Sequence, residues 1–256
     1  MPSSLTFDEH LAVLETAGRR LAELVALAGR EAPVPTCPKW NAQALLAHQA
    51  MVHRWATAIV QGRAPITDPD EVTLRTATDL PAYYLEGHAG LVAALRGAPR
   101  DLDVMIFLKD APPPRQFWAR RQAHETKVHM VDALAASLGR LPTAADVDIE
   151  PALAVDGIDE LLRGFFTRGR CRLYDGSDET LVVVATDVAR RWVVHVGERL
   201  TVEPGEGLLG NRHDATISGT SANLYLALWN RGGEVDTSGG GDLLERWAAR
   251  QQVRWR

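Results

Sequence analysis

Four long stretches with helical periodicity, separated by clusters of proline and glycine, dominate the first half of this chain. In the first stretch, leucines from Leu11 to Leu27 recur at three- to seven-residue spacings and form one apolar stripe, as in an amphipathic helix. Proline disrupts a helix interior and glycine weakens it, so the clusters mark the joints. The expected helices span residues 7–27, 41–61, 80–96 and 115–138. This pattern predicts a four-helix bundle.

The pattern changes in the second half of the chain, where runs of β-branched residues appear. Residues 180–187 and 191–196 predict two strands joined by a short turn, and residues 200–203 and 214–218 are shorter strand candidates. Further helices are expected at residues 152–167, 222–230 and 242–253. Helices that frame an antiparallel sheet would make this half an α+β domain.

The joint between the two halves is expected within residues 139–148, which contain Pro142. We therefore predict two domains, a metal-binding four-helix bundle at residues 1–143 and an α+β domain at residues 144–256. The chain of 256 residues is long enough for each domain to bury a core.

Charge and composition exclude several classes of protein. A net charge of -5 argues against nucleic acid or an anionic membrane as the main partner. We find neither a signal peptide nor an apolar run of membrane-spanning length, so we expect a cytoplasmic protein. The two cysteines, Cys37 and Cys171, are too few for a disulfide scaffold. The expected oligomeric state is a monomer or a homodimer.

Glu125 and His129 lie four residues apart in the last expected helix of the bundle. This spacing places both side chains on one helical face, where they can close on one metal ion. His48, in the second expected helix, could complete the set from a neighbouring helix. Two imidazoles and one carboxylate leave coordination positions open, as in catalytic rather than structural zinc sites. The alternative is that the pair belongs to an exposed polar face.

Three residues near this trio each allow a functional and a purely structural interpretation. Asp132 follows His129 by three positions and could orient its imidazole, or could be solvent-exposed. Trp40 could wall the pocket, or simply fill the core as most tryptophans at helical spacing do. Cys37 precedes a helix start, where thiol pKa values fall, but Pro38 and the lack of a partnered base argue against a nucleophile.

Three segments resemble one known family. They are CPKWNAQALLAHQAMVHRWA at 37–56, RRQAHETKVHMVDAL at 120–134 and DATISGTSANLYLALWNR at 214–231. In this order they are similar to the actinobacterial proteins related to mycothiol-dependent maleylpyruvate isomerase. The resemblance implies a DinB-like four-helix bundle followed by a small sterol-carrier-like α+β domain. It also implies zinc ligands at His48, Glu125 and His129, and a substrate-facing arginine at Arg231.

The resemblance and the ligand chemistry together predict a metal-dependent enzyme that uses mycothiol as its thiol cosubstrate. An open-sided divalent cation, preferably Zn²⁺, can hold a thiol as thiolate at neutral pH, and the thiolate can add to a small electrophilic substrate. The outcome is cis–trans isomerisation or S-transfer. Arg231 is the expected catalytic residue, and Arg121 and Trp40 are the expected cofactor-binding residues; Arg231 or Arg121 would hold a substrate carboxylate. The alternative is a non-catalytic small-ligand-binding or stress-linked interaction protein with a vestigial metal site.

The two-domain prediction is checked by limited proteolysis of the folded protein. We expect the first cuts within residues 138–148, because proline and small residues there separate two different periodicities. Peptide mapping by mass spectrometry locates the cuts. Uniform cutting inside residues 115–136 would contradict the bundle.

Overall fold

The computed structural model describes residues 5–64, 70–204, 213–240 and 242–253, and it divides into two compact units. The N-terminal unit comprises Leu5–Phe107 and Pro112–Pro142. The C-terminal unit comprises Leu108–Ala111 and the chain from Thr143 onward. Leu108 belongs there because its side chain lies against Gly164, where an added Cβ would be 3.1 Å from Leu108 Cδ1.

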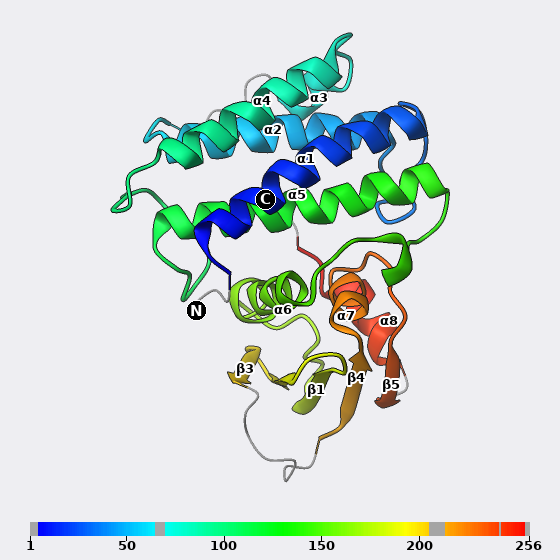
Figure 1. Ribbon diagram of the computed structural model, residues 1–256. Coiled ribbons are helices and arrows are strands. Elements are labelled where there is room, and N and C mark those ends of the chain that lie inside the picture. The colour runs from blue at the N-terminus through cyan, green and yellow to red at the C-terminus, as the bar shows by residue number, and fades with distance from the viewer. Residues whose placement is uncertain (1–4, 65–69, 205–212, 241, 254–256) are drawn as a thin grey trace. The chain divides into compact units, whose positions relative to one another are not determined.

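The N-terminal unit is a four-helix bundle in its described residues, as the sequence predicts (Figure 1). Helix α1 packs against α4 and α5, and α2 packs against the same two helices, so the four close around one core. A short helix, α3, lies between the second and third expected helices, where the sequence analysis predicts no helix, and it packs against α2. The bounds are α1 Phe7–Ala28, α2 Ala42–Val60, α3 Glu71–Leu74, α4 Leu80–Gly97 and α5 Pro114–Leu138.

Local signals in the sequence set the ends of these helices. Thr6 and Glu9 form a capping box at the start of α1, and the side-chain oxygen of Asn41 accepts a bond from the Ala44 amide at 2.9 Å. Pro114 begins α5, at the position where a missing N–H costs nothing. Gly139 ends α5 in the left-handed conformation, with φ 68°. The helices that carry His48 and Glu125 therefore have defined starts.

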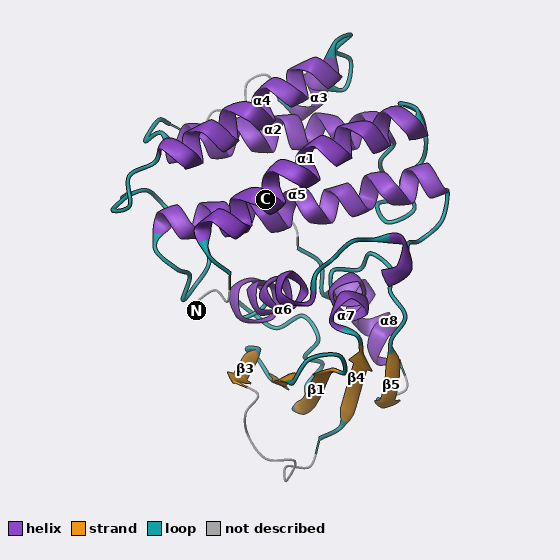
Figure 2. Ribbon diagram, in the orientation of Figure 1, coloured by secondary structure: helices purple, strands orange, loops and turns teal. Residues whose placement is uncertain are grey.

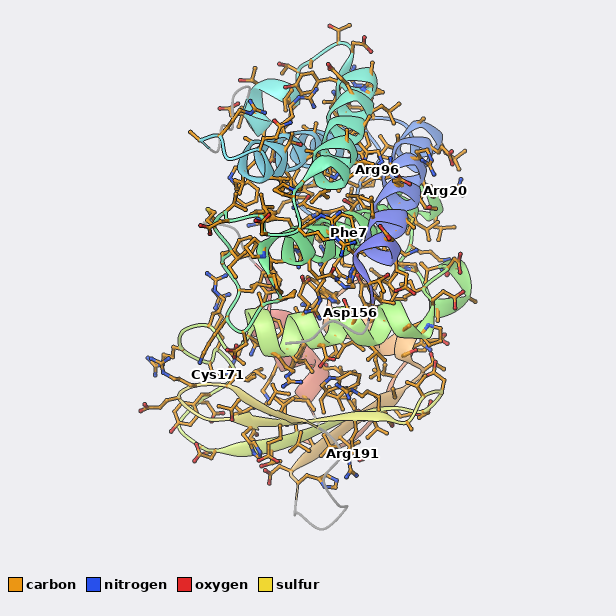
Figure 3. The ribbon with its side chains drawn as sticks, turned by 60° about the vertical axis from the view of Figure 1, so that its left-hand side comes forward. Phe7, Arg20, Arg96, Asp156, Cys171 and Arg191 are labelled. Carbon is orange, nitrogen blue, oxygen red and sulfur yellow. The ribbon has the colours of Figure 1, made fainter. Side chains whose placement is uncertain are left out.

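Polar contacts join the outer surfaces of neighbouring helices. Arg96 of α4 forms an ion pair with Glu15 of α1 (Figure 3). The guanidinium of Arg115, at the start of α5, lies 3.5 Å from the centre of the Phe7 ring, which is also marked in Figure 3. These partly exposed pairs contribute little individually, since water screens them.

The bundle interior contains an unusual set of buried imidazoles. His53 Nε2 lies 2.9 Å from Thr126 Oγ1, and the His53 and His88 rings are 5.4 Å apart. The Tyr84 hydroxyl donates to the Gly18 carbonyl at 3.0 Å. Gly18 leaves room for the His88 ring, because an added Cβ would approach His88 Cε1 to 2.2 Å and displace that ring. Burial lowers the pKa of His88, and it lowers that of His53 well below 6.5.

The described part of the C-terminal unit contains a five-stranded sheet in the order β3-β2-β1-β4-β5. Strands β1 and β4 are parallel, while the other neighbours are antiparallel, so the prediction of an antiparallel sheet is wrong. Strand β4 pairs with the edge of β1 left free by the β1-β2-β3 meander, and side-chain alternation carries no information about strand direction. Strand β5 was not predicted. The bounds are β1 Glu179–Ala185, β2 Arg190–Val196, β3 Thr201–Pro204, β4 Ala215–Gly219 and β5 Asp236–Gly239.

Helices α6 and α7 lie over one face of this sheet (Figure 2). The helix expected at residues 152–167 changes after Asp159 into a π-helical segment, η2, which hydrophobic periodicity cannot reveal. Asp159 itself accepts a bond from Trp192 Nε1 of β2 at 2.9 Å. Cys171, marked in Figure 3, is buried in this unit. The bounds are η1 Ala144–Asp146, α6 Pro151–Asp159, η2 Glu160–Phe165, α7 Ser221–Leu228 and α8 Leu243–Arg250.

The predicted fold class, a helical bundle followed by a small α+β unit, is confirmed. None of the helices in the described residues combines the length and apolar character needed to cross a membrane. The predicted domain boundary stays a prediction, and so does the independent folding of the two domains.

Buried His53 and His88 should make folding stability depend on pH. Their pKa values are lowered in the folded state, so below pH 6.5 the unfolded chain binds more protons and stability falls with acidification. Each imidazole can contribute at most about 1.4 kcal/mol per pH unit to this slope, the limit reached when it is protonated in the unfolded chain and neutral in the fold. Urea titrations of the metal-free protein between pH 5 and about 6.5 measure it.

The variants His53→Gln and His88→Gln test this assignment through the slope. Each substitution should lower the slope of the free energy of unfolding against pH by the contribution of the imidazole that it removes. This holds whatever the substitution does to the free energy of unfolding itself. His195→Gln, which replaces a partly exposed histidine of β2 outside the bundle, is the matched control. Unchanged slopes in both core variants would show that folding does not change the protonation of the two imidazoles, and would overturn the assignment.

Candidate metal centre

His48 of α2 meets Glu125 and His129 of α5 inside the bundle. Glu125 Oε1 lies 3.6 Å from His48 Nε2 and 3.4 Å from His129 Nε2. One ligand atom from each residue lies within 4.8 Å of the others, and all three residues are buried. The four-residue spacing puts Glu125 and His129 on one face of α5, and the packing of α2 on α5 supplies His48. The structure thus brings the three predicted ligands together.

The other nitrogen of each imidazole is held by a carboxylate. His48 Nδ1 lies 3.1 Å from Glu71 Oε2, and His129 Nδ1 lies 2.7 Å from Asp132 Oδ2. With Nδ1–H donating to the carboxylate, the Nε2 lone pair of each ring is available to a shared point beside Glu125. Asp132 is fully buried, so it orients His129 and the alternative of solvent exposure is wrong.

Glu71 was missed by the sequence analysis. It belongs to the short helix α3, which lies between the second and third expected helices and was not predicted. Its partner His48 is 23 residues away, and no periodicity links the two positions. The sequence offered only a weak local signal for α3, which is the helix-capping residue Asp70 directly before Glu71. In the structure Asp70 Oδ1 accepts a bond from the Thr73 amide at 2.7 Å and caps the helix.

Glu125 is the test of whether a cation fits. Its Oε2 accepts a bond from Arg121 Nη2 at 3.1 Å, whereas its buried Oε1 has no hydrogen-bond partner among the described residues. A buried carboxylate oxygen without a hydrogen bond is costly, and a cation placed between it and the two imidazole nitrogens would compensate it. The donor set of two nitrogens and one carboxylate oxygen suits Zn²⁺ better than Mg²⁺ or Ca²⁺.

Neighbouring groups in the cluster stabilise the charged forms of Glu125, His48 and Glu71. Burial acts to raise the pKa of Glu125, but His129, His48 and Arg121 outweigh it and hold that pKa well below 4.5. Burial acts to lower the pKa of His48, but Glu125 and Glu71 raise it to about 9. Without a cation His48 therefore carries a proton at neutral pH, and a cation would displace it. The bond to His48 is the main cause that lowers the pKa of Glu71 to about 2.

Trp40 covers one side of the cluster. Its ring centre lies 4.8 Å from that of His48 and 5.7 Å from that of His129. This placement agrees with a pocket wall, although its role in cofactor binding stays a prediction. Cys37 Sγ donates to Asp132 Oδ2 at 3.6 Å, and that carboxylate also holds His129, so the contact favours a structural role for the thiol over a nucleophilic one.

The two arginines fall in different places. Arg121 has a side chain only 1% exposed and bonds to Glu125, so its position favours support of that carboxylate over contact with a substrate. Arg231 belongs to the C-terminal unit, where its Nη1 donates to the Trp229 carbonyl at 2.7 Å. The catalytic role of Arg231 stays a prediction.

Fold and cluster together define a class of protein: a helical bundle with a buried His–Glu–His centre, followed by a small α+β unit. Residues 11–134 match the family described as the mycothiol maleylpyruvate isomerase N-terminal domain, and residues 152–246 match the MDMPI C-terminal domain. The chain therefore belongs to the mycothiol maleylpyruvate isomerase family, as the sequence predicts.

Two solved structures are similar along nearly the whole chain. The crystal structure of the mycothiol-dependent maleylpyruvate isomerase aligns with a TM-score of 0.65, and that of a histidine-to-alanine mutant aligns with 0.64. Both alignments have 17% sequence identity and cover 93% of this chain and 96% of the other. At this identity the likeness shows the fold. None of the curated proteins compared with the chain by sequence matches it.

Metal binding is checked by elemental analysis of the purified protein. We expect about one divalent ion per chain, predominantly zinc, because His48, Glu125 and His129 form an open three-ligand set. His48→Ala and His129→Ala should each lose the ion during dialysis. His195→Ala removes a histidine of the sheet and is the matched control, which should keep it. Equal metal in all four proteins would place the site elsewhere.

Proposed function

We propose that this chain is an enzyme that uses a low-molecular-weight thiol, mycothiol, to isomerise a small electrophilic carboxylate of the maleylpyruvate type. The observation that supports this most is the buried cluster of His48, Glu125 and His129, in which Glu125 Oε1 lacks a hydrogen-bond partner among the described residues. Family membership and the shared fold support the same reaction class. The proposed cation is Zn²⁺.

A divalent cation bound here would supply Lewis-acid stabilisation of a thiolate at neutral pH. His48 and His129 would hold it through their Nε2 atoms, while Glu71 and Asp132 orient the two rings from their Nδ1 side. Glu125 adds one negative charge, which limits the net charge of the centre. Trp40 places an apolar ring beside both imidazoles and excludes water from that side.

The reaction then follows from the chemistry of a thiolate and an electron-poor double bond. The sulfur bonds to one alkene carbon, and the π electrons move to the conjugated carbonyl. The former double bond is now single and rotates. Expulsion of the thiolate re-forms the double bond in the trans configuration and returns the thiol unchanged. If the adduct takes up a proton instead, the thiol is consumed and the outcome is S-transfer.

We assign the substrate carboxylate to Arg231, because a guanidinium binds a carboxylate through two parallel hydrogen bonds. The buried position of Arg121, bonded to Glu125, supports Arg231 over Arg121 in this role. The partners of the protein would then be a thiol and a small acid in the cytoplasm.

Glu125→Gln should abolish thiol-dependent turnover while the fold is kept. The glutamine oxygen can still accept from Arg121, but the charge is gone, so the cation is held more weakly and activity should fall by about 100-fold or more. The assay follows isomerised product and free thiol separately, with mycothiol and maleylpyruvate and then a panel of electrophiles. Circular dichroism confirms folding.

Glu86→Gln is the matched control, because Glu86 is an exposed carboxylate of the same bundle that pairs with Arg54. It should keep full activity. Product formed with thiol recovered supports isomerisation, and thiol consumed in proportion to product supports S-transfer. Turnover that does not depend on any thiol would overturn the proposed function.

A further inference from the structure

Glu71 differs from the other carboxylates of the centre because it comes from a separate element. The residues His48, Glu125, His129 and Asp132 lie on the long helices α2 and α5, whereas Glu71 lies on α3, a helix of four residues. Its side chain is 22% exposed, while that of Asp132 is fully buried. Glu71 therefore reaches the centre from the edge of the bundle.

Within the described residues, two side-chain hydrogen bonds reinforce the packing of α3 and its C-terminal end on α2. Glu71 Oε2 bonds to His48 Nδ1 at 3.1 Å, and the Gln43 side chain donates to the Arg75 carbonyl at 3.2 Å. Arg75 also forms an ion pair with Glu71, so the carboxylate is held from within its own segment. Of these contacts, the one between Glu71 and His48 joins α3 to a proposed metal ligand.

We propose that Glu71 is a positioning residue for His48, and that docking of α3 on α2 is coupled to cation binding at the centre. This inference rests on the proposed ligand set. An acceptor at Nδ1 selects the ring orientation and the tautomer that present Nε2 to a cation. A cation on Nε2 in turn makes Nδ1–H a better donor to Glu71. Such coupling is reciprocal, so each event strengthens the other by the same factor.

The second histidine provides an internal comparison. Asp132 and His129 are three residues apart on the same helix, so their contact at 2.7 Å forms with the helix itself. No separate element has to dock for it. One half of the centre is therefore fixed by α5, and the other half depends on α3.

The affinity for Zn²⁺, measured by competition with a chromogenic chelator, tests the positioning role. Glu71→Ala should weaken binding by about 10- to 100-fold, the range seen when such outer carboxylates are lost. Glu71→Gln keeps an oxygen that can accept from Nδ1–H, so it should recover part of the loss. Glu86→Gln removes an exposed carboxylate elsewhere in the bundle and should bind as the unaltered protein does.

Hydrogen exchange tests the coupling in a way that a purely structural role would not affect. Adding Zn²⁺ to the unaltered chain should slow exchange of the amides of residues 73–76, and in Glu71→Ala it should not. Nitrogen chemical shifts of the His48 ring report the same contact directly, because the Zn²⁺-bound unaltered protein should show a protonated Nδ1 with a strong acceptor.

The outcomes separate this inference from the proposed function. If the unaltered protein binds Zn²⁺ through His48 but Glu71→Ala binds equally well, the positioning role is overturned and the ligand set stands. If Zn²⁺ changes exchange in α3 equally in the unaltered protein and in Glu71→Ala, the coupling through Glu71 is overturned. If the unaltered protein binds no Zn²⁺, the ligand set fails, and this inference fails with it.

Discussion

The buried carboxylate of Glu125 determines how the centre of the bundle is built. An ionised carboxylate in a protein interior is strongly unfavourable unless opposite charges and hydrogen bonds compensate it. Arg121, one helical turn before Glu125, compensates the negative charge with its guanidinium. The imidazoles of His48 and His129 provide the remaining contacts to the carboxylate. The packing of α2 on α5 brings His48 to the carboxylate from a second helix.

The same logic continues outward from the imidazoles. Each ring must place two nitrogens, and Glu71 and Asp132 take the ones that face away from Glu125. Further along the seam between α2 and α5, His53 bonds to Thr126 instead, and there burial without a carboxylate partner keeps the ring neutral. Two histidines five residues apart on one helix thus acquire opposite pKa shifts, because one faces carboxylates and the other faces a hydroxyl.

The sequence predicted what depends on short-range spacing and missed what depends on long-range pairing. The helices of the bundle and the Glu125–His129 pair follow from positions three or four apart, and the contact of Asp132 with His129 was one of two alternatives that the same spacing left open. His48 could be added because its segment resembled a family in which that position is a ligand. Glu71 could not, since its contact with His48 arises from the docking of a four-residue helix. The parallel pairing of β1 with β4 was not predicted for a similar reason. Alternation of polar and apolar side chains predicts a strand, but it does not indicate which strand lies beside it.

Helix α5 carries the functional side chains at fixed intervals: Arg121, Glu125, His129 and Asp132 follow one another at spacings of four, four and three. Each residue added to or removed from a helix rotates everything after it by about 100°. A single insertion between Arg121 and Asp132 would therefore turn part of this set away from α2 while changing no residue type. Between Arg121 and Asp132, the number of residues is therefore as much a part of the site as the side chains are. Insertions or deletions in this part of α5 would be less tolerable than most substitutions on the surface of the helix.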